Sequence, residues 1–172
     1  MNPVIENILT RRSCRAFTGE PVSRGDIETL LGCARYAPSA NNRRLWKFTA
    51  VLDRALIQKL AKAVGAAAGA DEGYCFYDPA ALIIPSTQED YRYGREDNAC
   101  ALENLFLAAH SLGLASVWIN QAFGNCRDPG VREVLAELGV PANHVVYGMA
   151  ALGYAAVELP EVDKAADTAI VG

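Results

Sequence analysis

Three arginines and a serine are crowded into five residues near the start of the chain, Arg11-Arg12-Ser13-Cys14-Arg15. A guanidinium presents a planar fork of N–H donors that matches two phosphate oxygens at once, and a serine hydroxyl adds a further donor. The cluster therefore indicates a site for a phosphorylated ligand. The alternative is a solvated basic surface with no ligand, which is the common role of basic residues near a terminus.

A second polar segment, from Ala37 to Trp46, reads Ala-Pro-Ser-Ala-Asn-Asn-Arg-Arg-Leu-Trp. Pro, Ser and Asn stop helices and form turns, so this composition predicts at least a connecting loop. The Asn42 amide also donates and accepts hydrogen bonds, which suits a ligand ring that carries both kinds of group. The guanidinium groups of Arg43 and Arg44 lead to the hypothesis that the loop attracts an anionic acceptor or the phosphates of a dinucleotide.

Metal chemistry is not indicated by the cysteines and histidines. None of the five cysteines forms a C-x-x-C pair, and the chain has only two histidines, so no zinc site is predicted. Cys14 is interpreted as structural, and His110 as a histidine packed in the core or at an interface. His144 has no nucleophile motif of the G-x-S-x-G type around it.

Length and composition predict a single domain spanning residues 1–172, with 51% apolar and 21% charged residues. Residues 1–54 carry nine Lys/Arg against five Asp/Glu, whereas the remainder carries seven against fifteen. An acidic total with a basic first third fits a small anionic ligand better than nucleic acid or a membrane surface. The N-terminal residues lack a signal-peptide pattern and no apolar run could span a membrane, so a cytoplasmic location is expected.

Apolar periodicity and capping residues predict the elements that must position these groups. Helices are predicted to start at Asn2, at Ser23, at Asp53 (ending near Val64), at about Arg95 (ending at Ser111) and at Asp128. Strands are predicted at Trp46–Leu52, Ala81–Pro85, Ala115–Ile119 and His144–Leu152. The helix from 95 to 111 is apolar on more than one face, which favours a core or a subunit interface.

Two segments are predicted to be less regular. Residues from about 65 to 96 form a short lid region that is rich in Gly, Ala and Tyr, and residues from about 160 to 172 form an extended tail. The lid tyrosines either cover the edge of the core, which we favour, or line a pocket. No G-x-G-x-x-G or G-x-x-x-x-G-K-[ST] motif occurs, so neither a Rossmann fold nor a P-loop is predicted.

The order of four motifs resembles the FMN-dependent nitroreductase family. The motifs are R-R-S-x-R-x-F at 11–17, A-P-S-x-x-N-x-x-x-W at 37–46, D-x-A-x-A-x-E-N-x-x-L-A-A-x-x-L-G-L-x-S-x-W at 97–118, and L-G-V-P at 138–141 followed by G-x-x-x-L-G-Y at 148–154. The resemblance implies an α+β fold of three layers, α/β/α, with a central, mostly antiparallel sheet in an intertwined homodimer. It also implies noncovalent FMN at the subunit interface and ping-pong hydride transfer from NADH or NADPH, through flavin N5, to nitroaromatics, quinones or related acceptors.

The resemblance also implies roles for individual residues. Arg11 and Ser13 would bind the phosphate and ribityl chain, and Arg12 would also belong to the cofactor site. Arg15 would lie near the pyrimidine edge of the flavin, where a cation stabilises added negative charge. Pro38, Ser39 and Ala40 would approach the flavin from the partner chain, and Asn42 would lie near the ring edge or the ribityl chain. Asn120 and Gln121 match the segment that faces the flavin N5 and O4 atoms.

Two departures from the family pattern concern charge. Arg44-Leu45 replaces the usual Gln-Pro, and the tail lacks a basic pair near the phosphate, leaving Lys164 as the substitute. Two other functions stay open: a non-catalytic flavin- or nucleotide-binding module on the same fold, and a small nucleic-acid binder that uses the basic first third of the chain.

Overall fold

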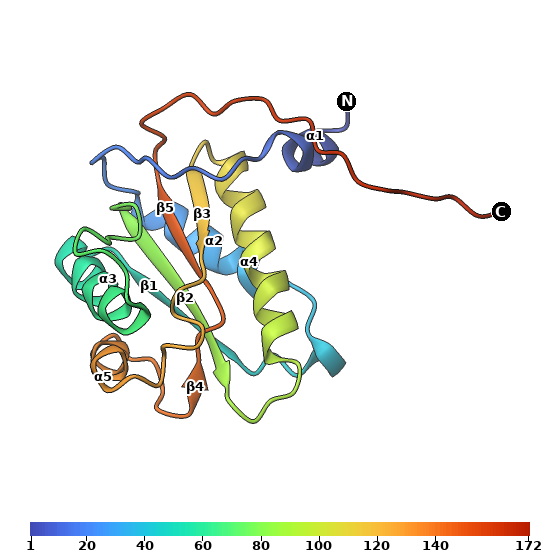
Figure 1. Cartoon of the computed structure of the whole chain (residues 1–172). Coiled ribbons are helices and arrows are strands. Elements are labelled where there is room, and N and C mark those ends of the chain that lie inside the picture. The colour runs from blue at the N-terminus through green and yellow to red at the C-terminus, as the bar shows by residue number, and fades with distance from the viewer.

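The computed structural model describes all residues from 1 to 172 (Figure 1). Its helices are α1 (Pro3–Thr10), α2 (Arg24–Arg35), α3 (Arg54–Ala68), α4 (Gly94–Ser111) and α5 (Pro129–Glu137), with a short 3₁₀ turn at Ala40–Asn42. Its strands are β1 (Trp46–Val51), β2 (Ala81–Gln88), β3 (Ala115–Ile119), β4 (His144–Val145) and β5 (Met149–Gly153). No helix combines the length and apolarity needed to cross a membrane.

The strands form one sheet in the order β1-β2-β5-β3, with β4 paired to β2 beyond the end of β5. Every pairing between these strands is antiparallel. β3 is an edge strand, so one side of its backbone has no neighbouring strand except a single bridge at Ser116. The sheet has the antiparallel character predicted from the sequence.

Each face of the sheet is covered by two helices. One core lies under α3 and α5 and the other under α2 and α4, and Figure 1 shows these pairs on opposite sides of the sheet. β2 contributes to both cores by alternation, since Leu82 and Ile84 face the first and Ile83 faces the second. The three-layer α+β fold predicted from the sequence is confirmed.

Helix α1 lies outside these layers and buries none of its residues. It is held against α4 by the Asn7 amide, whose Nδ2 donates to the Leu107 carbonyl at 2.9 Å. Its apolar stripe remains exposed, with exposed fractions of 66% at Val4 and 51% at Ile8. An apolar helix face of this kind normally has a covering partner.

The last predicted strand, His144–Leu152, is wrong as a single element. The structure has two strands, because the register with β2 changes between them: Ala150 lies opposite Ile83, whereas Val145 lies opposite Thr87. From Val145 to Ala150 the chain advances five residues, whereas β2 advances only four, from Ile83 to Thr87. One extra residue on one side of a strand pair is the arrangement of a β-bulge. The chain bends at the intervening residues 146–148, where the indole of Trp118 packs against Gly148.

Replacing Gly148 by alanine is expected to lower the free energy of unfolding by about 1–3 kcal/mol, because a core atom is added where no space exists. A Cβ at this position would lie 2.5 Å from Cε2 and Cζ2 of the Trp118 indole. Urea unfolding measures the change. The matched control is Gly25→Ala in α2, whose added Cβ meets only the Ser23 hydroxyl at 3.8 Å. Equal midpoints for the two variants would contradict the packing of Trp118 on Gly148.

The predicted lid region contains more regular structure than its composition indicated. Helix α3 ends at Ala68, β2 occupies Ala81–Gln88 and α4 begins at Gly94. Irregular backbone therefore remains at 69–80 and 89–93, and a lid function for these connections stays a prediction. Tyr91 is almost fully buried, whereas Tyr77 and Tyr93 keep 40% and 39% of their surface exposed.

Candidate functional site

The arginine cluster crosses the end of the sheet at which β3 begins. The Cys14 N–H donates to the Ser116 carbonyl at 3.0 Å, and the Ala156 N–H donates to the Ala16 carbonyl at 2.9 Å. Cys14 is fully buried and its thiol donates to the Ala16 carbonyl, which agrees with the structural role predicted for it. The alternation of an extended chain then directs Ser13 and Arg15 outward.

Arg11 has no partner for its charge within the chain. The ion pairs of the structure involve other arginines and lysines, and none of the side-chain hydrogen bonds includes the Arg11 guanidinium. Its Cζ lies 5.9 Å from the centre of the Phe106 ring on α4, which holds the group in place by a cation–π contact. The half-buried guanidinium is therefore available to an external anion.

Arg12 is partly used by the backbone. Its Nη1 donates to the carbonyls of Leu9 at 2.6 Å and Arg11 at 2.9 Å, whereas its Nε is buried without a partner. A buried N–H with no acceptor is costly unless a ligand or a water supplies one. Arg12 is thus a second donor that can be satisfied from outside the chain.

Two adjoining hollows open at this cluster. The smaller has a volume of about 210 Å³ and is lined by Arg11, Arg12, His110, Gly113, Leu114, Ala115, Ser116, Ala155 and Leu159. The larger, of about 550 Å³, is lined by Thr10, Arg12, His110 and the tail from Leu159 to Asp163. The smaller hollow contains cationic groups and no carboxylate, so it suits a phosphate. Lys164 is exposed on the tail, one residue beyond the lining of the larger hollow.

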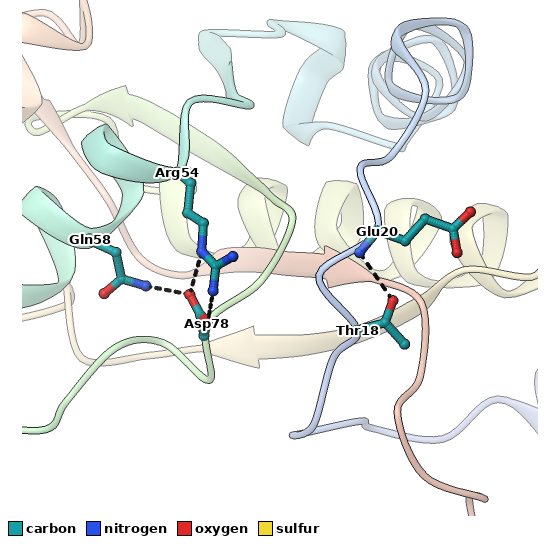
Figure 2. A network of polar contacts seen from close by, with 5 residues as sticks. All are labelled: Thr18, Glu20, Arg54, Gln58 and Asp78. Atoms are coloured by element: carbon teal, nitrogen blue, oxygen red, sulfur yellow. Dashed lines mark hydrogen bonds and ion pairs between the residues drawn. The ribbon is translucent and has the colours of Figure 1, made fainter.

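Arg15 lies at the other side of the cluster, with its Cζ 6.0 Å from the centre of the Tyr77 ring. Tyr77 belongs to three consecutive residues, 76–78, with positive φ, a conformation that non-glycine residues adopt only when held there. Figure 2 shows the contacts that hold Asp78, whose Oδ1 accepts from Arg54 Nε at 3.1 Å and from Gln58 Nε2 at 2.7 Å. Helix α3 therefore positions Tyr77, and Tyr77 positions Arg15.

The segment from Pro38 to Asn42 is anchored by a buried carboxylate. The Ala40 N–H donates to Asp97 Oδ1 at 2.9 Å, and the Tyr91 hydroxyl donates to Asp97 Oδ2 at 3.0 Å. Asp97 lies in the first turn of α4 with 4% of its surface exposed. The exposed Pro38 and the half-buried Ser39 precede a turn in which Asn41 and Asn42 have φ of 52° and 54°, values that asparagine tolerates well.

Asp97 and Tyr91 are positioning residues that sequence reasoning did not identify. Asp97 was noted only as part of a motif, although an acidic residue in the first turn of a helix is itself stabilising. Its contact with Ala40 spans 57 residues of sequence, so no local pattern reveals it.

The structure separates the two arginines that follow this loop. Arg43 places its Cζ 5.6 Å from the centre of the Tyr91 ring, whereas Arg44 folds back and donates from Nε to the Asn42 carbonyl at 3.4 Å. Neither has a carboxylate partner.

Asn120 and Gln121 follow β3 at the end of the sheet opposite the arginine cluster, and both side chains are exposed. The Asn120 N–H donates to Gln121 Oε1 at 3.2 Å, which turns part of this amide toward its own loop. The five residues of β3 separate this loop from the arginine cluster.

The predicted site residues thus fall at two ends of α4. The arginine cluster lies beside the last turn of this helix at His110, and the Pro38–Asn42 loop lies beside its first turn at Asp97. Thirteen residues of helix separate these points, or about 20 Å. Within one chain the two groups of predicted site residues are therefore far apart along α4.

His144 and Ser86 form a pair that is distant in sequence. His144 Nδ1 lies 3.0 Å from the Ser86 hydroxyl, but Ser86 is fully buried and no carboxylate orients the imidazole. The pair therefore lacks the access and the third member of a hydrolytic triad. No group of three His, Cys, Asp or Glu side chains is arranged to hold a metal ion.

Stability is expected to fall as the pH drops below about 6.5. Burial first, and then the positive charges of Lys47 and Arg132, lower the pKa of His144 in the folded protein. The unfolded state therefore binds more protons than the folded state between the two pKa values, which lowers stability there. Urea midpoints at about pH 7.5 and about pH 5.5 measure the effect, and His144→Gln should reduce the difference. The pKa of His110 is also lowered, by burial and by the charges of Arg11 and Arg12, so this residue contributes in the same direction. Midpoints in His144→Gln that respond to pH as in the wild type would contradict the assignment.

Comparison with known proteins supports a single relationship. The family profile described as Nitroreductase family matches residues 8–154. The chain is 34% identical over 159 residues to a protein of Archaeoglobus fulgidus described as a candidate NADH dehydrogenase/NAD(P)H nitroreductase, covering 90% of this chain and 86% of that one. It is 31% identical over 160 residues to the NADPH-flavin oxidoreductase of Vibrio harveyi, covering 87% and 65%.

Solved structures agree with the sequence comparisons. A nitroreductase with bound FMN from Bacteroides fragilis superposes with a TM-score of 0.94 at 39% identity, covering 100% of both chains. A nitroreductase with bound FMN from Desulfitobacterium hafniense gives a TM-score of 0.85 at 25% identity, covering 96% of this chain and 95% of that one.

Proposed function

Because the chain belongs to the nitroreductase family, we propose that it is an FMN-dependent oxidoreductase that takes electrons from NADH or NADPH and passes them to nitroaromatic, quinone or related small acceptors. The chemistry that FMN supplies when bound is acceptance of a hydride from the nicotinamide and delivery of electrons to the acceptor. The main observation that supports this proposal is the cationic hollow at Arg11 and Arg12, which contains no carboxylate. It lies next to an edge strand along which an elongated anion can lie.

The residues of the hollow fit the phosphate end of FMN. Arg11 and Arg12 line the hollow, the first with an unpaired guanidinium and the second with a buried Nε that has no acceptor. Ser13 follows them in the chain, outside the lining of the hollow, and its hydroxyl is exposed. Each supplies donors, and a phosphate offers only acceptors at neutral pH. These three residues bind the phosphate and the adjoining ribityl chain.

Arg15 acts on the reacting part of the cofactor. Its guanidinium is held over the Tyr77 ring and has no carboxylate partner, so its charge is fixed in place and not neutralised. A fixed cation beside the pyrimidine edge stabilises the negative charge that builds up there as electrons arrive. No side chain is assigned as an acid or a base.

The second half of the site comes from a second copy of the chain. Within one chain the Pro38–Asn42 loop lies at the far end of α4 from the arginine cluster, and this separation supports a loop that reaches the flavin from the partner chain. An exposed apolar groove of about 720 Å³, lined by α1, α2 and α4 residues that include Val4, Ile8 and Leu107, offers the contact surface for a homodimer. Asn120 and Gln121 complete the part of the site that binds the flavin ring.

A single pocket serves both half-reactions. A dedicated dinucleotide domain is absent from this fold, so the nicotinamide contacts the flavin directly and leaves before the acceptor enters the same place. This alternation is a ping-pong mechanism, and it requires only that one face of the flavin ring be accessible. The connections at 69–80 and 89–93 are short, which favours a site that accepts acceptors of different shapes.

One anaerobic titration tests the proposal. The purified protein is expected to be yellow, to lose its flavin absorbance when NADH or NADPH is added, and to recover it when a quinone or nitroaromatic follows. A yellow protein that neither donor bleaches would support the non-catalytic flavin-binding module. A colourless protein that binds DNA or RNA in a salt-sensitive manner would support the nucleic-acid binder.

A further inference from the structure

His110 lies in the last turn of α4 and lines both hollows beside Arg12. Its Nε2 is 2.8 Å from the Thr10 hydroxyl oxygen. That hydroxyl has one proton, and it donates this proton to the Glu6 carbonyl at 2.8 Å. With this proton on the Glu6 carbonyl, the Thr10 oxygen accepts from His110, and the neutral imidazole is assigned as the Nε2–H tautomer.

This tautomer leaves the other ring nitrogen free. Nδ1 of His110 has no hydrogen-bond partner, and in the neutral ring it can only accept. A second proton on the imidazole converts Nδ1 into a charged N–H donor. An anion in the hollow would then gain both a hydrogen bond and a positive charge.

The charges around His110 decide when that proton binds. Burial first, and then the positive charges of Arg11 and Arg12, lower the pKa of His110 in the ligand-free chain. The smaller hollow contains no carboxylate, and the acidic residues that line the larger hollow are Glu161 and Asp163 of the tail. Glu6 lies one turn before Thr10 on α1, and its side chain is exposed. A bound phosphate would offset the repulsion from the two guanidinium groups and favour the charged imidazole.

We propose that His110 is a third ligand of the FMN phosphate, together with Arg11 and Arg12, and that it takes up a proton from solvent when the phosphate binds. The inference rests on the proposed FMN site and extends it to a residue that the sequence analysis placed in the core or at an interface. It also assigns to α4 the cationic contribution that Lys164 was expected to provide from the tail.

The proposal predicts a particular pH dependence of FMN affinity. Below about pH 6 the phosphate itself loses one negative charge, which weakens binding in every variant. The contribution of His110 is therefore the difference between the wild type and His110→Gln. This difference is expected to reach about tenfold in affinity near pH 6 and to vanish near pH 8.5, since the imidazole is then neutral.

Titration of flavin-free protein with FMN, followed by flavin fluorescence, measures these affinities. His110→Lys keeps a cation at the site at all these pH values. This variant should bind FMN at least as tightly as the wild type, and its affinity should lack the pH dependence that His110 contributes. His144→Gln is the matched control, because it removes the other histidine, and its profile should follow the wild type. Riboflavin lacks the phosphate and should bind the wild type and His110→Gln equally.

Each outcome decides a separate point. Proton uptake on FMN binding, measured calorimetrically in two buffers, should be present in the wild type and reduced in His110→Gln. Parallel pH profiles for these two proteins, or an equal loss of riboflavin binding, would overturn the role of His110 while leaving the FMN site intact. Failure of the wild type to bind FMN at all would instead overturn the proposed function.

Discussion

Arg11→Ala is expected to fold normally and to purify with little or no FMN. The substitution removes charge-assisted hydrogen bonds to the phosphate that contribute about 1.5–3 kcal/mol, which corresponds to about 10- to 150-fold in affinity. The fold should tolerate the change because the guanidinium makes no ion pair or hydrogen bond within the chain and only lies over Phe106. The ratio of flavin to protein absorbance, together with a titration of flavin-free protein with FMN, gives the result.

Arg24→Ala is the matched control for Arg11→Ala. Arg24 begins α2, its side chain is 88% exposed, and it pairs only with Glu28 one turn along the same helix. Such a pair contributes little to stability and is unrelated to the hollow. Full flavin occupancy in Arg11→Ala would show that the cluster is the solvated basic surface of the alternative interpretation.

Ile8→Asp is expected to separate the homodimer and, with it, to empty both flavin sites. The side chain of Ile8 is 51% exposed in the single chain and lines the apolar groove that the partner is proposed to cover. A carboxylate buried at such an interface without a partner costs several kcal/mol, which is sufficient to dissociate many dimers. The monomer should remain folded, because α1 buries none of its residues.

Light scattering and the flavin absorbance test Ile8→Asp together. Leu52→Asp serves as control, since Leu52 is 44% exposed but lies outside the groove, beside Thr18 and Arg54. That variant should stay dimeric and yellow. If Ile8→Asp remained a dimer with full FMN content, the groove would not be part of the dimer interface.

Helix starts were predictable because capping is local. Asn2, Ser23, Asp53 and Asp128 each accept a hydrogen bond from a backbone N–H of the first turn, as their residue types indicated. The break between β4 and β5 was not predictable, because it depends on the register with β2 and on the Trp118 ring against Gly148. A continuous apolar run contains no signal for a bulge.

The same distinction separates the parts of the candidate site. The chemistry of Arg11, Ser13 and Arg15 follows from their side chains, and their roles toward a flavin came from the resemblance to a known family. The support given by Asp97 to Ala40 and by Thr10 to His110 crosses 57 and 100 residues of sequence. Such contacts exist only after the chain folds, so the positioning of the site required the structure.

If each FMN lies between the Arg11–Arg15 segment of one chain and the Pro38–Asn42 loop of its partner, a mixed dimer gives the most direct test. A dimer of one Arg11→Ala chain and one Asn42→Asp chain would contain one site with both changes and one site with neither. Asparagine and aspartate both tolerate the positive φ at position 42, so Asn42→Asp changes the charge beside the flavin and preserves the backbone.

The measurement is the FMN content of that mixed dimer, purified through a different affinity tag on each chain and compared with the two parent homodimers. The two-chain site predicts one tightly bound FMN per mixed dimer, with about half of the wild-type activity, while both parents hold little. A mixed dimer that holds no more FMN than its parents would show that both segments act within one chain, and it would contradict the shared site.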